Sequence, residues 1–166
     1  QDMPAKTEYI ERVPLTEEQK QLYISYLSKL KHPELKHLDQ ETIRKNRIRI
    51  LAGLTRLRQI CCDPGLFVRD YQGESAKRKR LMDIVKDAKR SGKRMLIFSQ
   101  FTQMLQRIGE ELRIEDISYF YLDGQTPAEE RLQICRSFNQ GKNDICLISL
   151  KAGGTGLNLV GADTVV

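Results

Sequence analysis

The sequence predicts an α/β protein in which a parallel β-sheet is flanked by helices and preceded by a helical N-terminal segment. Two observations lead to this fold class. From residue 95 onward, short apolar runs alternate with stretches of helical spacing, which is typical of a parallel sheet buried on both faces. Before that, the apolar residues between 17 and 62 recur at helical spacing. We therefore divide the chain into a helical segment, residues 1–75, and an α/β segment, residues 76–166.

The first helix is predicted to begin at about Glu17, after a polar and irregular start. Thr16-Glu17-Glu18-Gln19 has the pattern of a capping box, in which the side chains of the first and last residue bond each other's backbone amides. The pattern stops before Pro33, which cannot continue a helix. Its apolar face is formed by Leu22, Tyr26, Leu27 and Leu30.

A long basic helix is predicted from about Glu41 to Cys62, ended by Asp63-Pro64. Its apolar stripe consists of Ile43, Ile50, Leu51, Leu54, Leu57, Ile60 and Cys61, and its basic residues are Arg44, Lys45, Arg47, Arg49, Arg56 and Arg58. After a loop at residues 69–75, Ser75 can cap another helix that ends at Ser91-Gly92.

Strands and helices then alternate. Strands are predicted at 95–98, 119–122 and 144–149, with another starting at Thr164. One helix lies between the first two strands, and the next begins with Thr126 as N-cap and Pro127 at its first position. Short connections imply right-handed crossovers, so three turns should meet where the strands end: Ser99-Gln100, Gly124–Thr126 and Ser149–Asn158.

The last of these turns is rich in glycine. Gly153, Gly154 and Gly156 allow positive φ and close approach of the backbone, so we expect free N–H groups suited to a phosphate. A Walker A loop requires Lys and then Ser or Thr after the last glycine, but Leu157-Asn158 follow. A dinucleotide fingerprint fails as well, because Leu159 stands at its third glycine. The alternative is that the glycines only form a tight corner.

Charge and composition favour an anionic partner. The net charge is +6, but residues 41–62 carry +5 and residues 76–94 carry +7, which concentrates positive charge in two helices. Nucleic acid is the commonest polyanion, although a charge run is often only a solvated helix face. Four cysteines without a C-x-x-C pair argue against zinc and for buried thiols, and no apolar run is long enough for a membrane span. We expect an intracellular protein without a metal site.

Four segments resemble one family. K-A-G-G-T-G-L-N-L resembles motif V of the Swi/Snf-type DNA-dependent ATPases, which are superfamily-two helicase-like translocases. M-L-I-F-S-Q-F resembles motif IV, and Y-L-D-G-Q-T-P-A-E-E-R resembles the signature after it. L-R-Q-I-C-C-D-P resembles the stretch that leads into the second lobe, where the family usually has His at the position of Asp63. Many members have Thr where this chain has Leu150.

The resemblance implies a second RecA-like lobe of an ATP-driven translocase on double-stranded DNA. By position, it places Ser99, Gln100, Gly124, Thr126, Arg131, Ser149, Lys151 and Gly153 on the DNA side, and Gly156 and Asn158 on the nucleotide side. It implies no catalytic residue and no metal ligand in this chain. ATP with Mg²⁺ would be bound mainly by a first lobe, so residues 1–166 alone should not hydrolyse ATP.

The same resemblance implies the partners: double-stranded DNA, the first lobe of the same protein, and nucleoprotein or RNA polymerase as further candidates. The location would be the cytoplasm or nucleoid of a bacterium or the nucleus of a eukaryote.

Two other functions remain open at this stage. The basic helices could bind an acidic protein partner without any motor activity, or the chain could be an autonomous nucleotide-binding α/β domain. For single residues, Thr126 could simply cap its helix and Arg131 could simply pair with a carboxylate. The short final strand also predicts an exposed sheet edge.

Overall fold

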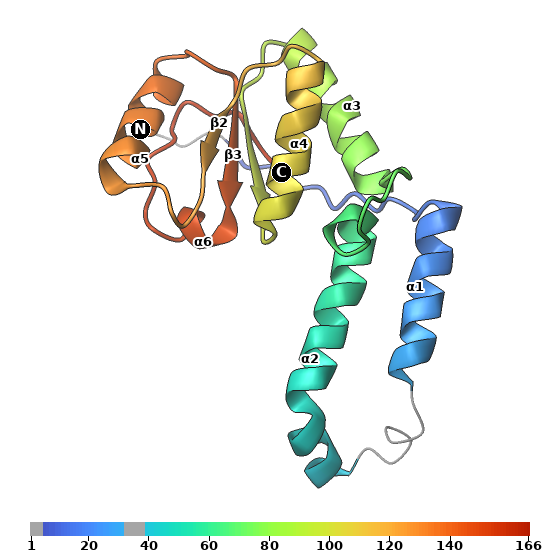
Figure 1. Cartoon of the computed structure of the whole chain (residues 1–166). Coiled ribbons are helices and arrows are strands. Elements are labelled where there is room, and N and C mark those ends of the chain that lie inside the picture. Colours follow the sequence, from blue (N-terminus) through green and yellow to red (C-terminus); the bar gives the residue numbers. More distant parts are fainter. Residues whose placement is uncertain (1–4, 32–38) are drawn as a thin grey trace.

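The computed structural model describes residues 5–31 and 39–166, which form an α/β lobe with a helical hairpin projecting from it (Figure 1). The hairpin consists of α1 (Glu17–Leu30) and α2 (Gln40–Cys62). Both helices were predicted close to these bounds. Pro33, predicted to stop the first of them, lies outside the described residues.

The predicted capping box starts α1. The Gln19 N–H donates to Thr16 Oγ1 at 3.2 Å, and the Thr16 N–H donates to Gln19 Oε1 at 3.3 Å. Each side chain thus satisfies an amide that the first helical turn leaves without an intrahelical partner.

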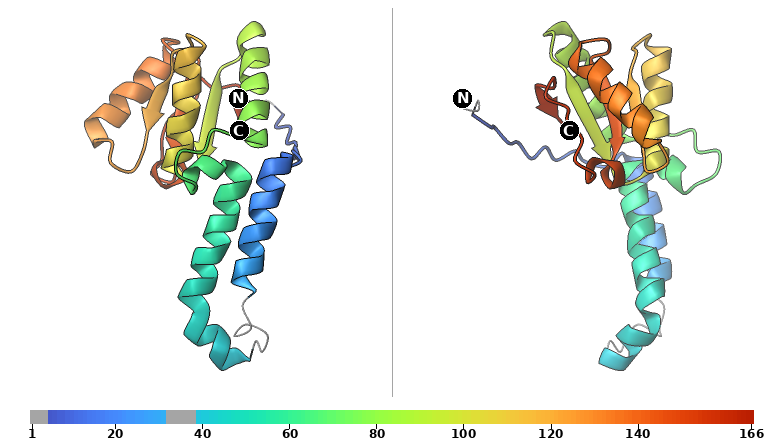
Figure 2. Two further views of the ribbon diagram at one scale, coloured as in Figure 1. Left: turned by 45° about the vertical axis from the view of Figure 1, so that its right-hand side comes forward. Right: turned by 90° about the vertical axis from the view of Figure 1, so that its left-hand side faces the viewer.

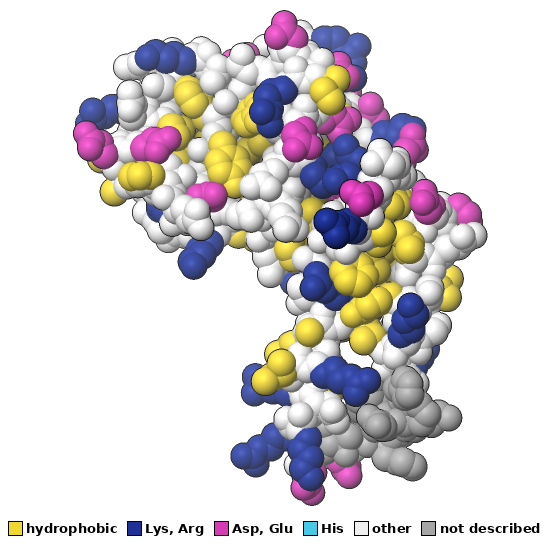
Figure 3. Space-filling view, in the orientation of Figure 1, with side chains coloured by type: hydrophobic (Ala, Val, Ile, Leu, Met, Phe, Trp, Pro, Cys, Tyr) yellow, Lys and Arg dark blue, Asp and Glu magenta, His cyan; other side chains and the backbone are white. Residues whose placement is uncertain are grey.

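The predicted apolar stripe of α2 is only partly buried. Leu57 and Ile60 are buried, but Ile43, Leu51 and Leu54 are 43%, 52% and 51% exposed. The reason is geometric, because α1 covers one side of α2 over most of its length and the lobe covers only its last turns. Figure 3 shows hydrophobic and basic side chains interspersed over this hairpin.

A short joint connects the hairpin to the lobe. It contains the 3₁₀ helix η2 (Pro64–Leu66) and leads to α3 (Ala76–Arg90). Ser75 caps α3 as predicted, since its hydroxyl accepts the Arg78 N–H at 3.2 Å. The same hydroxyl donates to the carbonyl of Cys62 at 2.6 Å, which ties the end of α2 to the start of α3.

The lobe is a RecA-like parallel sheet flanked by helices, as predicted. Its elements are β1 (Met95–Ser99), α4 (Thr102–Ile114), β2 (Phe120–Leu122), α5 (Ala128–Asn139), β3 (Ile145–Ser149), α6 (Leu150–Gly153) and β4 (Thr164–Val165). The four strands lie in the order β2-β3-β1-β4, and every neighbouring pair is parallel.

Helices cover both faces of the sheet, and successive side chains of a strand point to opposite faces, so both sets of side chains are buried. Met95 and Ile97 pack with α3 and α4, whereas Leu96 packs on the other side with Phe138 of α5. Figure 2 shows the resulting layers, with α3 and α4 over one face of the sheet and α5 over the other. Within the described residues, every helix is too short or too polar to cross a bilayer.

One predicted cap is wrong. Pro127, not Thr126, is the N-cap of α5, and no side chain bonds the first turn of that helix. The hydroxyl of Thr126 instead accepts the Asp123 N–H at 3.0 Å. Thr126 therefore closes the turn before the helix rather than the helix itself.

Candidate nucleic-acid interface

Three turns leave the sheet at one edge. The parallel register pairs Ser99 with Ser149 and Leu122 with Ile148, so β1, β2 and β3 end side by side. The following residues of all three strands must continue on the same side of the molecule. Figure 1 shows α6 at this edge, on the side of the lobe that faces the root of the hairpin. The structure thus brings the three predicted turns together.

The turn after β1 also meets the basic helix. Ser99 Oγ accepts the Phe101 N–H at 3.1 Å, and the exposed Gln100 accepts a hydrogen bond from Arg58 Nη2 at 2.5 Å. The Arg58 guanidinium also lies 5.7 Å from the centre of the Phe101 ring. The end of α2 therefore adds positive charge to this edge, which the sequence pattern did not indicate.

The turn after β2 is organised by Asp123. Its Oδ1 accepts the Gln125 N–H at 2.8 Å and the Thr126 N–H at 3.2 Å, and its Oδ2 accepts the Tyr121 hydroxyl at 3.0 Å. Burial raises the pKa of the Asp123 carboxyl, but the hydrogen bonds from Gln125, Tyr121 and Thr126 outweigh it and hold that pKa below its ordinary value. This role of Asp123 was not predicted from the sequence, although an Asp side chain that accepts the backbone N–H two residues later is the pattern of an Asx turn.

Tyr121 is the hydroxyl donor to Asp123 in this turn. Burial and the hydrogen bond to Asp123 together raise the pKa of the Tyr121 hydroxyl to about 12, so it remains a donor at neutral pH.

The turn after β3 differs from the expectation of free amides. Residues 150–153 form the short helix α6, and the N–H groups of Gly154 and Thr155 donate to the carbonyls of Leu150 and Ala152. The Ser149 hydroxyl accepts the Ala152 N–H at 3.2 Å and is buried, so it caps the start of α6 from inside the protein. The glycines thus allow a compact helical corner rather than an open nest of donors.

Arg131 joins two of the turns. From α5, its Nε donates to the carbonyl of Thr126 at 2.8 Å, and its Nη2 donates to the carbonyls of Asp123 and Gly124 at 3.1 and 3.2 Å. Its Nη1 donates to Thr155 Oγ1 at 3.1 Å. Arg131 therefore pairs with backbone carbonyls and a hydroxyl, and not with the carboxylate considered as an alternative.

The remaining predicted residues lie along the same loop. Lys151 is exposed beside Gly124, where a Cβ on the glycine would lie 3.6 Å from Lys151 Cδ. Gly156 and Asn158 are exposed further along. The Asn139 amide fixes that part of the loop to α5, because its Nδ2 donates to the carbonyl of Asn158 at 3.0 Å.

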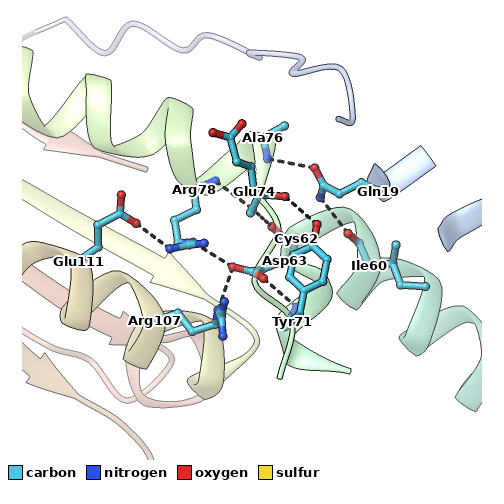
Figure 4. A network of polar contacts seen from close by, with 12 residues as sticks. Gln19, Ile60, Cys62, Asp63, Tyr71, Glu74, Ala76, Arg78, Arg107 and Glu111 are labelled. Carbon is cyan, nitrogen blue, oxygen red and sulfur yellow. Dashed lines mark hydrogen bonds and ion pairs between the residues drawn. The ribbon is translucent and has the colours of Figure 1, made fainter. Parts of the chain in front are cut away.

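A buried polar network lies behind this edge, at the joint with the hairpin (Figure 4). Asp63 is fully buried, and its Oδ2 lies 2.9 Å from Arg78 Nε and 3.0 Å from Arg107 Nε. Arg78 also pairs with Glu111 at 2.9 Å. Asp63 thus holds α3 and α4 together. No local pattern in the sequence indicates these long-range pairs.

Gln19 is the second buried member of the joint. Its Nε2 donates to the carbonyl of Ile60 at 3.0 Å, and its Oε1 accepts the Ala76 N–H at 3.0 Å. One side chain therefore connects α1, α2 and α3, in addition to its predicted part in the capping box.

The cysteines behave as thiols packed in the protein. All four are free, and Cys135 and Cys146 are buried as predicted, whereas Cys61 and Cys62 are only partly buried. Burial raises the pKa of Cys146 to about 12. Among residues 5–31 and 39–166, no three His, Cys, Asp or Glu side chains are placed to hold a metal ion.

Comparison with known proteins decides the family. The family described as helicase conserved C-terminal domain matches residues 76–166, which is the whole α/β lobe with α3. The chain belongs to this family. The SNF2-related domain matches residues 1–66, so the lobe is of the Swi/Snf type of helicase-like proteins.

Solved structures resemble this helicase C-terminal lobe and its hairpin. The C-terminal domain of the Sulfolobus solfataricus SWI2/SNF2 ATPase is 30% identical, with a TM-score of 0.80 over 91% of this chain and 66% of that one. The ATPase core from the same organism in complex with dsDNA is 26% identical, with a TM-score of 0.78 over 92% of this chain and 32% of that one.

Curated relatives are much longer than this chain. A putative ATP-dependent helicase/translocase of Bacillus subtilis, YwqA, is 32% identical over 173 aligned positions, which cover 99% of this chain and 18% of the relative. The nuclear protein STH1/NPS1 of Saccharomyces cerevisiae is 36% identical over 182 positions, covering 99% of this chain and 13% of the relative. The chain thus spans less than a fifth of either relative.

Proposed function

We propose that this chain is the second lobe of an ATP-driven translocase on double-stranded DNA, with residues 1–75 as a helical linker into the lobe at 76–166. The observation that carries the proposal is the meeting of three turns at one sheet edge, together with Arg58 from the basic helix. The likeness to a SWI2/SNF2 core that was solved with dsDNA supports duplex DNA as the partner. Such a protein would work in the cytoplasm or nucleoid, or in the nucleus.

The exposed groups at this edge would hold the phosphates of one DNA strand. Lys151 supplies a cation, Gln100 an amide, and Gly124 allows the backbone to come close, while Gly153 lets the loop pack against Phe98. Thr126 and Ser149 shape the turns, and Ser99 does so through its bond to the Phe101 N–H. Such contacts position the duplex without reading its sequence.

The nucleotide side of the proposal rests on the other half of the glycine loop. Gly156 and Asn158 would form one wall of a cleft that holds ATP with Mg²⁺, and a first lobe would supply most of the contacts. Phosphoryl transfer requires a phosphate-cradling lysine and positioned magnesium, so this chain alone should not hydrolyse ATP.

The hairpin would contact that first lobe. On α2, Leu51 and Leu54 are about half exposed beside Arg47 and Arg58, and such a mixed apolar and basic surface fits an intramolecular docking face. The alternative, an interaction module that binds an acidic protein, would use the same surface. It predicts that Leu51→Ala with Leu54→Ala abolishes protein binding, and that the unsubstituted protein shows no DNA-stimulated ATP hydrolysis.

Titration of duplex DNA at several salt concentrations tests the proposed function. We expect affinity to fall steeply with salt and to depend little on sequence, because backbone contacts release counterions. Lys151→Ala should weaken binding to all sequences alike and reduce the salt slope by about one unit. Lys142→Ala is the matched control, since this exposed lysine precedes β3 at the opposite edge of the sheet. Binding that ignores salt, or equal effects of the two substitutions, would argue against the proposed interface.

A further inference from the structure

The guanidinium of Arg131 is engaged within the protein. Each of its three nitrogens donates to a protein oxygen, and the acceptors are three backbone carbonyls of the turn after β2 and one hydroxyl of the loop after β3. An arginine that binds a phosphate in bidentate fashion needs two parallel N–H groups free. Arg131 has little donor capacity left, so its geometry fits the positioning of loops better than direct contact with DNA.

The acceptor in the second loop is itself anchored. Thr155 Oγ1 accepts from Arg131 Nη1 and donates to the carbonyl of Ala152 at 2.5 Å. Ala152 is fully buried at the base of α6, and its N–H is capped by Ser149 at the end of β3. A displacement of Thr155 would therefore involve the corner of the chain that includes Lys151.

The acceptors in the first turn are held equally firmly. Asp123 bonds the Gln125 and Thr126 amides through its carboxylate, while its own carbonyl and that of Gly124 receive Arg131 Nη2. The bonds from Asp123 within the turn after β2, and those from Arg131 to its carbonyls, therefore hold this turn in one conformation. The loop after β3 continues directly from Thr155 to Gly156, which has a φ of +72°.

We propose that Arg131 is a positioning residue whose bridge to Thr155 couples the DNA-side turn after β2 to the nucleotide-side part of the glycine loop. This inference rests on the proposed function. Phosphate contact at Gly124–Thr126 would fix the turn, and the bridge would then hold Gly156 and Asn158 in the position they take when DNA is bound. Loss of the bridge would uncouple DNA binding from ATP turnover and leave each binding surface in place.

Thr155→Val tests the bridge with a side chain of nearly the same shape that lacks the hydroxyl. In the intact protein, we expect the ratio of DNA-stimulated to DNA-free ATP hydrolysis to fall at least about fivefold, the lower end of typical coupling effects. The Kd for duplex DNA and the DNA-free rate should stay within about twofold, because Thr155 belongs to neither proposed binding set. Thr155→Ser, which keeps the hydroxyl, should restore stimulation.

Thr55→Val is the matched control. The hydroxyl of Thr55 also donates to a carbonyl of its own helical turn, that of Leu51, but it is exposed on α2 and bridges no other element in that bond. This variant should retain full stimulation. If Thr155→Val stimulates like wild type, or if it loses DNA affinity in proportion to activity, the coupling role is overturned while the proposed function stands. If wild-type protein shows no DNA-stimulated hydrolysis at all, the proposed function itself fails.

Discussion

Glycines in one loop serve different physical purposes. A Cβ on Gly153 would lie 2.7 Å from a ring carbon of Phe98, so this position requires a residue without a side chain. Gly156 has a φ of +72°, which side chains rarely tolerate, although nothing lies within 4 Å of its Cβ position. Gly154 has an ordinary helical φ of −71° and no close neighbour. The three residues look alike in the sequence but should respond differently to substitution.

Gly156→Ala should lower the free energy of unfolding by about 1 kcal/mol, because alanine at positive φ brings its Cβ against the carbonyl. Gly154→Ala should change it by less than about 0.5 kcal/mol, since its backbone already suits alanine. Urea denaturation followed by circular dichroism measures both. Equal destabilisation by the two substitutions would contradict the assigned conformations.

At the scale of elements, Gln19 connects three helices through one side chain. It is fully buried, and its amide bonds backbone groups of two other helices, the carbonyl of Ile60 and the N–H of Ala76. A buried polar group is stable only when it is hydrogen-bonded, so removing one amide leaves two buried backbone groups without that partner. Gln19 therefore helps to hold the start of α1 against the ends of two other helices.

Gln19→Ala should destabilise the hairpin by about 2 kcal/mol, the typical penalty for buried polar groups left unpaired. Gln21→Ala, two positions along the same helix and exposed, should cost less than about 0.5 kcal/mol. Amide hydrogen exchange would locate the effect, with protection lost in α1 and retained in β1 and β3. Uniform loss of protection would show that the hairpin and lobe unfold together.

At the scale of the whole molecule, Asp63 joins the hairpin to the lobe. It lies in the joint after α2 and pairs with Arg78 of α3 and Arg107 of α4, and its side chain has no exposed surface. Its Oδ1 also accepts the Gly65 N–H at 2.8 Å. This buried carboxylate therefore contributes, with the Ser75 and Gln19 hydrogen bonds, to the placement of the basic helix relative to the sheet edge.

Asp63→Asn should lower the free energy of unfolding by about 3 kcal/mol, because two partly buried arginines lose their shared charge. The value lies at the lower end for buried pairs, since Arg78 keeps Glu111 as a partner. Asp87→Asn is the control, an exposed ion pair with Arg90 within α3 that should contribute less than about 1 kcal/mol. Thermal unfolding of both variants decides the matter, and a neutral Asp63→Asn would contradict the network.

Much of the fold could be predicted because its signals are local. The Thr16–Gln19 capping box, the Ser75 cap and the alternation of strands and helices each depend on residues close in sequence. The parallel direction of the strands followed from the short connections, and it placed the three turns at one edge. Their roles toward DNA and nucleotide remain predictions.

The rest could not be predicted because it depends on distant partners. Neither Asp63 nor Gln19 carries a local sign of the residues it meets across the fold. Thr126 was predicted as a helix cap, but the competing bond to Asp123 closes the preceding turn. The exposure of Leu51 and Leu54 depends on how far α1 and the lobe extend along α2, which periodicity alone does not determine.

The strand order has a consequence for synthesis on the ribosome. β2 hydrogen-bonds only to β3 among the described strands, and β3 lies between β2 and β1 although it is made after both. The first two strands to emerge thus cannot pair with each other and must wait for residues 145–149. Until then, the apolar side chains of β1 and β2 are exposed to aggregation, so the synthesis of β3 is the step at which the first three strands can join in one sheet.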